Sequence, residues 1–408
     1  MGLFEITTLV IVLTAAFSYL NCRYIRLPTT VGVMAISLTL SLALLGLGEI
    51  WPAFRISATE LISHIDFNRT LLQGMLAFLL FAGAQHVQLD ELRRELMPVT
   101  FLAVIGTIVS MFIIAALALL AMRAGGFHLP FVWCLLFGAL VSPTDPVAVI
   151  GVMRKLHAPA ALETQIAGES LFNDGVGIVL FSVILTDIGG GGSPSLIHIA
   201  EMVVGQSFGG IIIGLLTGLL VNAMLKRVDD YKVELLLSIA LAMGSYVAAN
   251  LLRLSGPIAV VVAGLLIGNQ GRISGMAEAS RQNFDTFWEL LDEILNAVLF
   301  VLIGLEVLAM PRGHTYLIAA ILCVPVALIA RIVSVAGTVK LLRFWHPMRP
   351  GTIRVLTWGG LRGGLSMAMA LAIPHGEYRE PIILATYAIV VFSILIQGLT
   401  VGQIVKRL

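Results

Sequence analysis

Runs of about 20 apolar residues recur along the whole chain and constrain its fold more than any other feature. A helix of about 20 residues crosses a bilayer hydrocarbon core of about 30 Å. With 58% hydrophobic and 12% charged residues, the chain is not a soluble domain. It is predicted to be an all-α polytopic membrane protein of about 13 transmembrane helices, near residues 4–22, 28–47, 70–88, 97–122, 131–152, 161–187, 198–225, 233–252, 255–270, 287–310, 316–342, 353–374 and 381–404.

The distribution of basic residues predicts the orientation of these helices. Short cytoplasmic loops retain lysine and arginine. Seventeen of the 25 lysines and arginines follow odd-numbered segments or lie at the C-terminal end, against six on the opposite side. We therefore expect a multi-pass protein of the cell (inner) membrane with its N-terminus outside and its C-terminus in the cytoplasm. The net charge of +1 argues against a nucleic-acid partner.

The chain is expected to form a single membrane domain over residues 1–408, built from two halves. The glycine-rich stretch Gly189–Gly192, followed by Ser193 and Pro194, reads as a hinge between them. Counting helices gives a first inverted repeat over 1–187, a linker with helix seven over 188–232, and a second inverted repeat over 233–408. Helix five then corresponds to helix twelve, which is the layout of inverted-repeat transporters.

Both of these corresponding helices are interrupted in the middle. Helix five contains Ser142-Pro143-Thr144-Asp145-Pro146, whose two prolines remove backbone donors. Helix twelve contains Gly359-Gly360-Leu361-Arg362-Gly363-Gly364. Irregular backbone at this depth is tolerated where it is buried in protein or lines a polar cavity. A pair of discontinuous, crossing helices is therefore expected to mark the binding site of a transporter.

Helix six places Glu169, Ser170, Asn173 and Asp174 inside a hydrophobic span. Ser170 and Asp174 share one helical face, whereas Glu169 and Asn173 share a neighbouring face. Carboxylates at such depth are costly unless they are paired or hydrated. We expect Glu169 to form an ion pair with Arg362 of the second break, and Asp174 to lack a comparably deep cation.

A deep carboxylate without a cationic partner either holds a proton or coordinates a cation. A site that moves only when it is neutralised would exchange one ion for the other. The oxygen ligands available around Asp174 suit a hard ion such as Na⁺. This expected set comprises Asp174, Ser170, Asn173, Asp145 and the Thr144 carbonyl.

Three ordered motifs carry a resemblance to a known family. Ser142 to Ala148, Gly168 to Asp174 and Gly359 to Gly363, with Glu289 to Glu306, resemble the NhaP-type sodium/proton antiporters of the cation–proton antiporter superfamily, relatives of the animal sodium/proton exchangers. The resemblance implies a homodimer without a cofactor. It implies that Asp174 binds Na⁺ and H⁺, that Asn173, Ser170, Thr144 and Asp145 complete the site, and that Glu169 and Arg362 form the core ion pair.

The Asn173-Asp174 pair resembles the electroneutral branch, which implies exchange of one Na⁺ for one H⁺ and a role in pH homeostasis. The chain departs from the pattern at helix three, where many relatives carry an acidic ligand and this chain has Ala82. Water, backbone or another side chain must complete the shell, and Gln85 and His86 are two alternatives. A K⁺/H⁺ antiporter of the same fold therefore stays open.

Two rival classes fit the residues less well. A cation channel would reuse oxygen-lined broken helices, but it needs a continuous pore. An intramembrane aspartyl protease would need Asp145 and Asp174 as acid and base, yet the companion Tyr-Asp is absent from the sequence, so an enzyme is not expected. Where helix ten begins, a solvated or interfacial face is expected from Asp285, Glu289, Asp292 and Glu293, with ion recruitment as the alternative. Glu306 is one candidate partner for Arg331.

Overall fold

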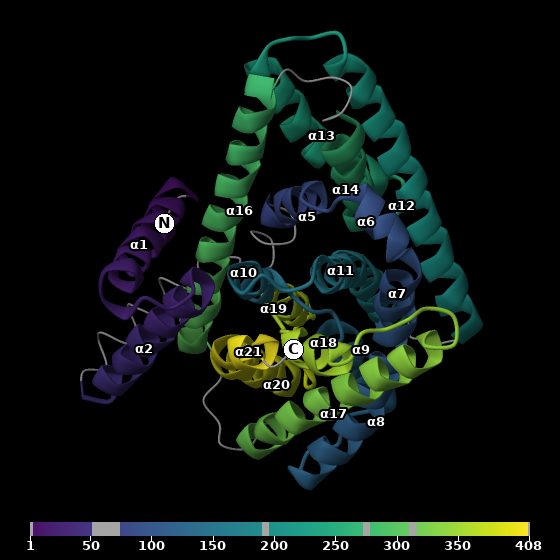
Figure 1. The fold of residues 1–408 in the computed structure, drawn as a ribbon. Coiled ribbons are helices and arrows are strands. Elements are labelled where there is room, and N and C mark those ends of the chain that lie inside the picture. The colour runs from purple at the N-terminus through teal and green to yellow at the C-terminus, as the bar shows by residue number, and fades with distance from the viewer. Residues whose placement is uncertain (1–2, 51–73, 190–195, 272–277, 310–315, 407–408) are drawn as a thin grey trace.

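The computed structural model describes residues 3–50, 74–189, 196–271, 278–309 and 316–406, and Figure 1 shows them as an assembly of helices. The glycine-rich stretch between the proposed halves falls almost wholly outside these residues. In the first part of the chain the helices are α1 Leu3–Leu20, α2 Thr29–Ile50, α5 Leu76–Gln85, α6 Leu89–Arg94, α7 Leu96–Thr100, α8 Thr107–Ala124, α9 Phe131–Val141, α10 Val147–Lys155 and α11 Ala160–Gly189. In the second part they are α12 Leu196–Leu225, α13 Tyr231–Leu251, α14 Gly256–Leu266, α16 Glu278–Glu306, α17 Leu317–Leu342, α18 Thr352–Gly359, α19 Gly364–Leu371, α20 Arg379–Phe392 and α21 Gly398–Val405.

Each of the thirteen expected segments overlaps at least one of these helices, which confirms the all-α polytopic fold. Within the described ranges, eight helical spans are long and apolar enough to cross a membrane. Three shorter apolar helices, Leu76–Gln85, Phe131–Val141 and Gly256–Asn269, add to them. α16 is equally long, but its first half carries several charged residues.

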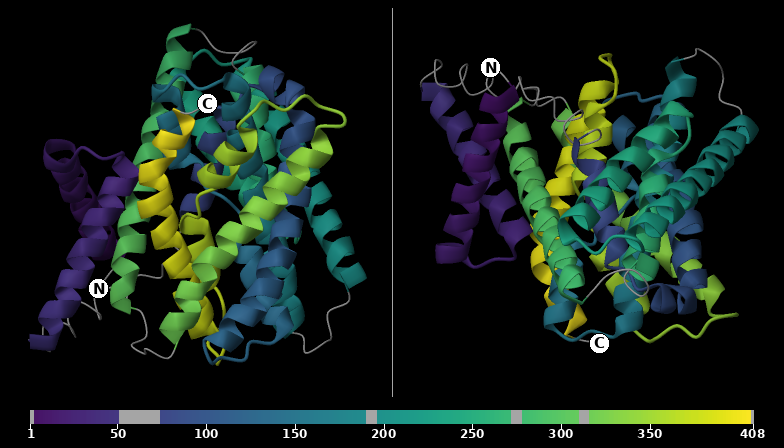
Figure 2. Two further views of the ribbon diagram at one scale, coloured as in Figure 1. Left: turned by 60° about the horizontal axis from the view of Figure 1, so that its bottom comes forward. Right: turned by 90° about the horizontal axis from the view of Figure 1, so that it is seen from above.

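The helices surround α11 and the two broken helices, which lie in the middle of the assembly (Figure 1). On one side α12, α13, α14 and α5 pack together, and on the other α17 packs against α8 and α20. α1 and α2 lie outside α16, as the two views of Figure 2 show. The Ser37 hydroxyl on α2 donates to the Val301 carbonyl of α16 over 2.8 Å and fixes this outer pair.

Both predicted breaks are present, and the two interrupted helices cross. α9 ends at Val141 and α10 begins at Val147, while α18 ends at Gly359 and α19 begins at Gly364. At the crossing the Asp145 N–H donates to the Leu361 carbonyl over 2.8 Å, forming an isolated antiparallel bridge. Two discontinuous helices thus meet through their unwound backbones.

A short π-helical segment at Ser393–Gln397 joins α20 to α21 beside this crossing. The Arg362 N–H donates to the Ser393 hydroxyl over 2.8 Å, and that hydroxyl donates to the Gln397 side chain over 2.7 Å. The extra residue of a π-turn redirects side chains locally. Here it brings polar groups of an otherwise apolar helix to the second break.

Candidate functional site

A cavity of about 490 Å³ opens between α5, α10, α11, α16 and α19. Among the predicted site residues, its walls include Asp174, Ser170, Thr144 and Asp145. Its lining also includes Gln88, just after α5, and Arg154, near the end of α10, both on the predicted cytoplasmic side. The cavity therefore joins the crossing point to the side on which basic loops predominate.

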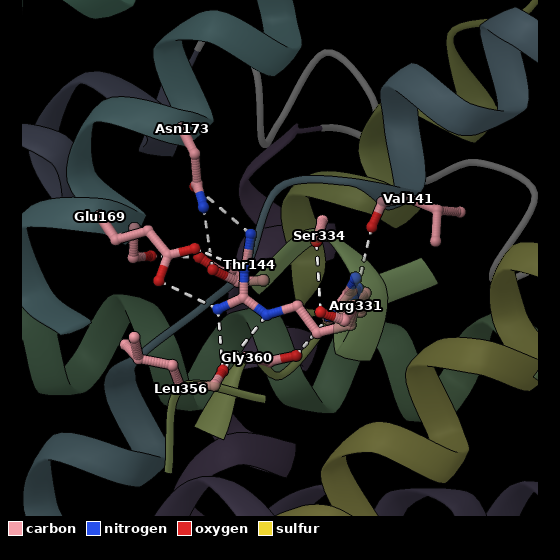
Figure 3. Close-up of polar contacts among 10 residues, drawn as sticks. Val141, Thr144, Glu169, Asn173, Arg331, Ser334, Leu356 and Gly360 are labelled. Carbon is pink, nitrogen blue, oxygen red and sulfur yellow. Dashed lines mark hydrogen bonds and ion pairs between the residues drawn. The ribbon is translucent and has the colours of Figure 1, made fainter. Parts of the chain in front are cut away.

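The backbone of the first break is held by α11. The Ser170 hydroxyl donates to the Thr144 carbonyl. The Asn173 amide donates to the Thr144 hydroxyl over 2.9 Å, and the Thr144 N–H donates to the Asn173 side-chain oxygen over 3.3 Å (Figure 3). Asn173 is fully buried and is not among the residues that line the cavity. It positions Thr144 from behind, whereas Ser170 and Thr144 reach the cavity wall.

Asp174 and Asp145 are both half-buried and both line the cavity. Within the described residues, no hydrogen bond or ion pair reaches the Asp174 carboxylate. The Asp145 carboxylate, by contrast, accepts from the Val147 N–H at the start of α10 over 3.0 Å. A Cβ atom at Gly363 would collide with the same carboxylate, so Asp145 also lies against the start of α19. Asp145 therefore compensates the positive ends of two half-helices.

The expected Glu169–Arg362 ion pair is wrong, because Arg331 of α17 is the partner of Glu169. One guanidinium nitrogen contacts Glu169 Oε1, and Nη2 donates to Oε2 over 3.0 Å (Figure 3). The same guanidinium donates to the Leu356 carbonyl of α18 from Nε over 3.2 Å and from Nη2 over 2.9 Å. Glu169 is 1% exposed and Arg331 5%, so the pair is buried. Glu306, the alternative partner for Arg331, is not involved.

Arg362 instead binds backbone carbonyls. Its Nε donates to the Val141 carbonyl over 2.9 Å, and Nη1 donates to the Gly360 carbonyl. Broken helices leave carbonyls without intrahelical partners at their C-terminal ends, and those ends carry partial negative charge. Because α9 and α18 both end here, they supply acceptors for a buried arginine without any carboxylate. Arg362 thus compensates the negative C-terminal ends of α9 and α18, as Asp145 compensates the positive N-terminal ends of α10 and α19.

Ala82, the helix-three residue that departs from the family pattern, brings no carboxylate to the site. Ala82 is fully buried on α5. His86 lines the cavity, and its Nδ1 lies 2.7 Å from the Ala82 carbonyl, whereas Gln85 is buried without a hydrogen bond to its amide. In the part of the chain that the structure describes, no cluster of three His, Cys, Asp or Glu side chains could hold a metal ion. The oxygen-bearing residues beside Asp174 in the cavity wall are Ser170, Thr144 and Asp145.

One wall of the cavity differs from its sequence interpretation. The expected solvated face of helix ten in fact lines the cavity, through Glu289, Asp292 and Glu293 of α16. Asn296, one turn after Asp292, donates to its Oδ1 over 3.1 Å and to its carbonyl over 2.9 Å. The i, i+3, i+4 and i+7 spacing of these four polar residues was the signal for one inward face. Ser366 of α19, which also lines the cavity, had no such signal.

The cavity is strongly acidic. Arg154 is the only lysine or arginine among its lining residues, and its Nε contacts Glu163 Oε1 over 2.6 Å at the outer end. The carboxylates that line it are Glu91, Asp145, Glu163, Asp174, Glu289, Asp292 and Glu293. A cleft lined by one sign of charge concentrates counter-ions. This cavity can therefore collect cations and lead them to Asp174.

Comparisons with known proteins identify the family to which the chain belongs. Residues 10–407 match the family described as sodium/hydrogen exchanger, transmembrane. The chain is 44% identical over 403 residues to the Na(+)/H(+) antiporter NhaP of Pseudomonas aeruginosa, covering 98% of this chain and 95% of that one. It is 31% identical to the Na(+)/H(+) antiporter NhaH of Halobacillus aidingensis, covering 95% of this chain and 93% of that one.

The fold also matches a solved structure. The sodium proton antiporter MjNhaP1 of Methanocaldococcus jannaschii at pH 8 aligns with a TM-score of 0.78 at 20% identity, over 100% of this chain and 99% of that one. At that identity the match concerns the fold alone. The family match and the two relatives show the same relationship at the level of sequence. The chain is thus an NhaP-type member of the sodium/hydrogen exchanger family, a family of membrane transporters and not of enzymes.

Proposed function

We propose that this protein exchanges Na⁺ for H⁺ across the membrane by alternating access, with Asp174 holding one ion or the other. The observation that carries this proposal is the carboxylate of Asp174, which faces the acidic cavity beside the helix crossing without a hydrogen bond or ion pair among the described residues. Ser170 and the Thr144 hydroxyl and carbonyl lie next to it in the cavity wall. No resident cofactor takes part.

At the helix crossing, the charged groups other than Asp174 hold the fold. Glu169 is paired with Arg331, Asp145 compensates two helix starts, and Arg362 compensates two helix ends. Such groups keep the same charge throughout a cycle. A single carboxylate would then be left to alternate between proton and cation, and the exchange of one Na⁺ for one H⁺ follows.

Electroneutrality is tested by current measurements. We expect Na⁺ concentration jumps on proteoliposomes adsorbed to a solid-supported membrane to produce no steady transport current, while an internal dye reports proton movement. The rate should not change when a K⁺ gradient with valinomycin imposes a membrane potential, because a neutral exchange performs no electrical work. A current that scales with the Na⁺ gradient would contradict the one-for-one exchange and leave antiport itself intact.

The same assay distinguishes Na⁺ from K⁺. Because Ala82 supplies no carboxylate, one charged ligand fewer surrounds the cation than in relatives with an acid at that position. K⁺/H⁺ exchange is therefore the second candidate function. Equal dye responses to Na⁺, Li⁺ and K⁺ pulses would favour it, whereas a response confined to Na⁺ and Li⁺ would support the first proposal.

The Arg154–Glu163 pair at the outer end of the cavity provides a second prediction. The Arg154 side chain is 55% exposed, so its charge acts mainly through the field in the cavity. We expect Arg154→Gln to lower the apparent KM for Na⁺ by about two- to threefold at low ionic strength, and Glu163→Gln to raise it, with kcat unchanged. High ionic strength should remove both effects.

Lys155→Gln is the matched control for this pair, because Lys155 is the exposed neighbour of Arg154 and does not line the cavity. It removes the same charge from the same helix end. If Lys155→Gln and Arg154→Gln changed KM equally, a general surface charge and not the cavity would set cation access.

The organisation around the site is proposed on sequence grounds. The inverted repeats over 1–187 and 233–408, the inner membrane location, the outside N-terminus and the cytoplasmic C-terminus follow from helix counting and basic loops. A homodimer follows from the NhaP-type resemblance. Accessibility of single cysteines to an impermeant reagent tests the orientation, and mass photometry in detergent tests the dimer.

A further inference from the structure

A second hollow lies away from the cavity described above. It has a volume of about 430 Å³ and is a groove lined by residues of α17, α18 and the end of α21. α17 and α21 each pack against α18, and Figure 1 shows the three helices together. Its residues include Ile332 of α17, Arg354 and Thr357 of α18, and Ile404 of α21. None of its residues lines the acidic cavity, so the groove is a separate feature of the molecule.

The floor of the groove is apolar. Ile332 is 48% exposed, and Ile353, Trp358 and Ile404 are partly exposed beside it. The Trp358 indole N–H already donates to the Thr400 hydroxyl over 2.9 Å, so its ring adds apolar surface and no free donor. Ile332 lies ten residues before the end of α17 at Leu342, a distance of about 15 Å along a helix. That is half of a hydrocarbon core of about 30 Å, the depth that one acyl chain occupies.

The polar end of the groove is suited to an anion. Arg354 is exposed, and within the described residues its guanidinium makes no hydrogen bond or ion pair. It lies in the first turn of α18, whose N-cap Gly351 has φ +87° and no capping side chain. The uncapped N–H groups of a helix start attract negative charge. The Thr357 side chain, 8% exposed, also lines the groove and has a hydroxyl without a partner.

The two chain segments at this end carry basic charges alone, and the carboxylate that contacts their loop is that of Glu95, 3.4 Å from His346. Residues 337–357 and 393–406 contain no aspartate or glutamate. The exposed cations on the same helix ends and their connecting loop are Lys340, Arg343, Arg349, Arg354 and Lys406. Phe344 and Trp345 in that loop are 82% and 62% exposed. Aromatic and basic side chains together are typical of the lipid headgroup region, where basic clusters attract anionic lipids.

We propose that this groove binds an anionic phospholipid, with its phosphate at Arg354 and the start of α18 and one acyl chain along Ile353, Trp358 and Ile332. A neutral lipid would fill the apolar floor but would leave the cation cluster without a counter-charge. A soluble phosphate would meet Arg354 but would leave the apolar floor uncovered. The bound lipid would hold α18, whose Leu356 carbonyl also accepts from Arg331 of the core ion pair.

Lipid binding is measured on the full chain in detergent. Delipidated protein is titrated with phosphatidylglycerol, with phosphatidylcholine of the same acyl chains, and with glycerol 3-phosphate, while native mass spectrometry counts bound molecules and thermal unfolding reports stabilisation. We expect phosphatidylglycerol to bind and stabilise, and Arg354→Gln to weaken its binding by about fivefold, the effect of one basic residue near an anionic lipid surface. Ile332→Trp, which fills the floor without changing charge, should weaken binding as well.

Arg94→Gln is the control, because Arg94 is an exposed arginine of α6 on the same predicted side of the membrane and does not line the groove. It should leave lipid binding unchanged. Equal binding of phosphatidylcholine, equal affinity for glycerol 3-phosphate, or full phosphatidylglycerol affinity in Arg354→Gln would each overturn the proposal. Elution profiles and unfolding temperatures without lipid show that the variants are folded, and none of these outcomes depends on the proposed ion exchange.

Discussion

Replacing Asp174 with asparagine is expected to abolish cation-driven proton movement. Asparagine keeps the size of the side chain but can neither hold a titrating proton nor supply a negative charge to a cation. We expect the response of an internal pH dye to Na⁺ or Li⁺ pulses in proteoliposomes to fall to that of protein-free liposomes. Because Asp174 makes no hydrogen bond or ion pair with a described residue, the variant should insert and unfold like the wild type.

Asp187→Asn is the matched control for this experiment. Asp187 lies on the same helix, α11, but is not a lining residue of the cavity. The control should retain wild-type rates. Sustained Na⁺-driven proton movement in Asp174→Asn, with a correctly folded protein, would show that another group carries the ion and would refute the proposed mechanism.

Breaking the Glu169–Arg331 pair is expected to have the largest effect on stability. Removing one partner of a buried pair leaves an uncompensated charge and costs about 3–5 kcal/mol. Arg331→Gln also deprives the Leu356 carbonyl of its donors. We therefore expect both Glu169→Gln and Arg331→Gln to unfold at markedly lower temperature in detergent. The charge swap Glu169→Arg with Arg331→Glu should not restore stability, because glutamate cannot donate to Leu356.

A double-mutant cycle identifies the true partner of Glu169. The coupling of Glu169→Gln with Arg331→Gln should be much larger than its coupling with Arg362→Gln, because Arg362 binds the Val141 and Gly360 carbonyls. Residues in one hydrogen-bonded network show couplings of about 0.5–3 kcal/mol. A larger coupling to Arg362 would mean that the geometry described for Arg331 does not persist in the membrane.

The helical architecture could be predicted from the sequence because it follows from local properties. Segment length and apolar content define each span, and the prolines of Ser142–Pro146 and the glycines of Gly359–Gly364 define the breaks. The same counting began helix ten at residue 287, whereas α16 begins at Glu278, because its charged first turns are not apolar. What counting does not provide is the rotation of each helix about its axis, and the site depends on that rotation.

The error over Arg362 has a specific physical origin. A buried arginine was assumed to need a carboxylate, yet carbonyls at helix ends accept from Nε and Nη1 of Arg362. Two helix ends meet at Arg362, and this only becomes visible once α9 and α18 are placed in space. Arg331, in the body of α17, meets one such carbonyl, that of Leu356, and its other contact is the Glu169 carboxylate.

The Asp145–Leu361 hydrogen bond has a consequence for how the protein tolerates change. The two broken helices are joined by a backbone N–H and a backbone carbonyl, groups that every residue except proline supplies. Ser170 and Asn173, by contrast, hold Thr144 of the same break through their side chains. Asp174 makes no hydrogen bond or ion pair with a described residue, so a substitution there changes the ion site and leaves the backbone join in place.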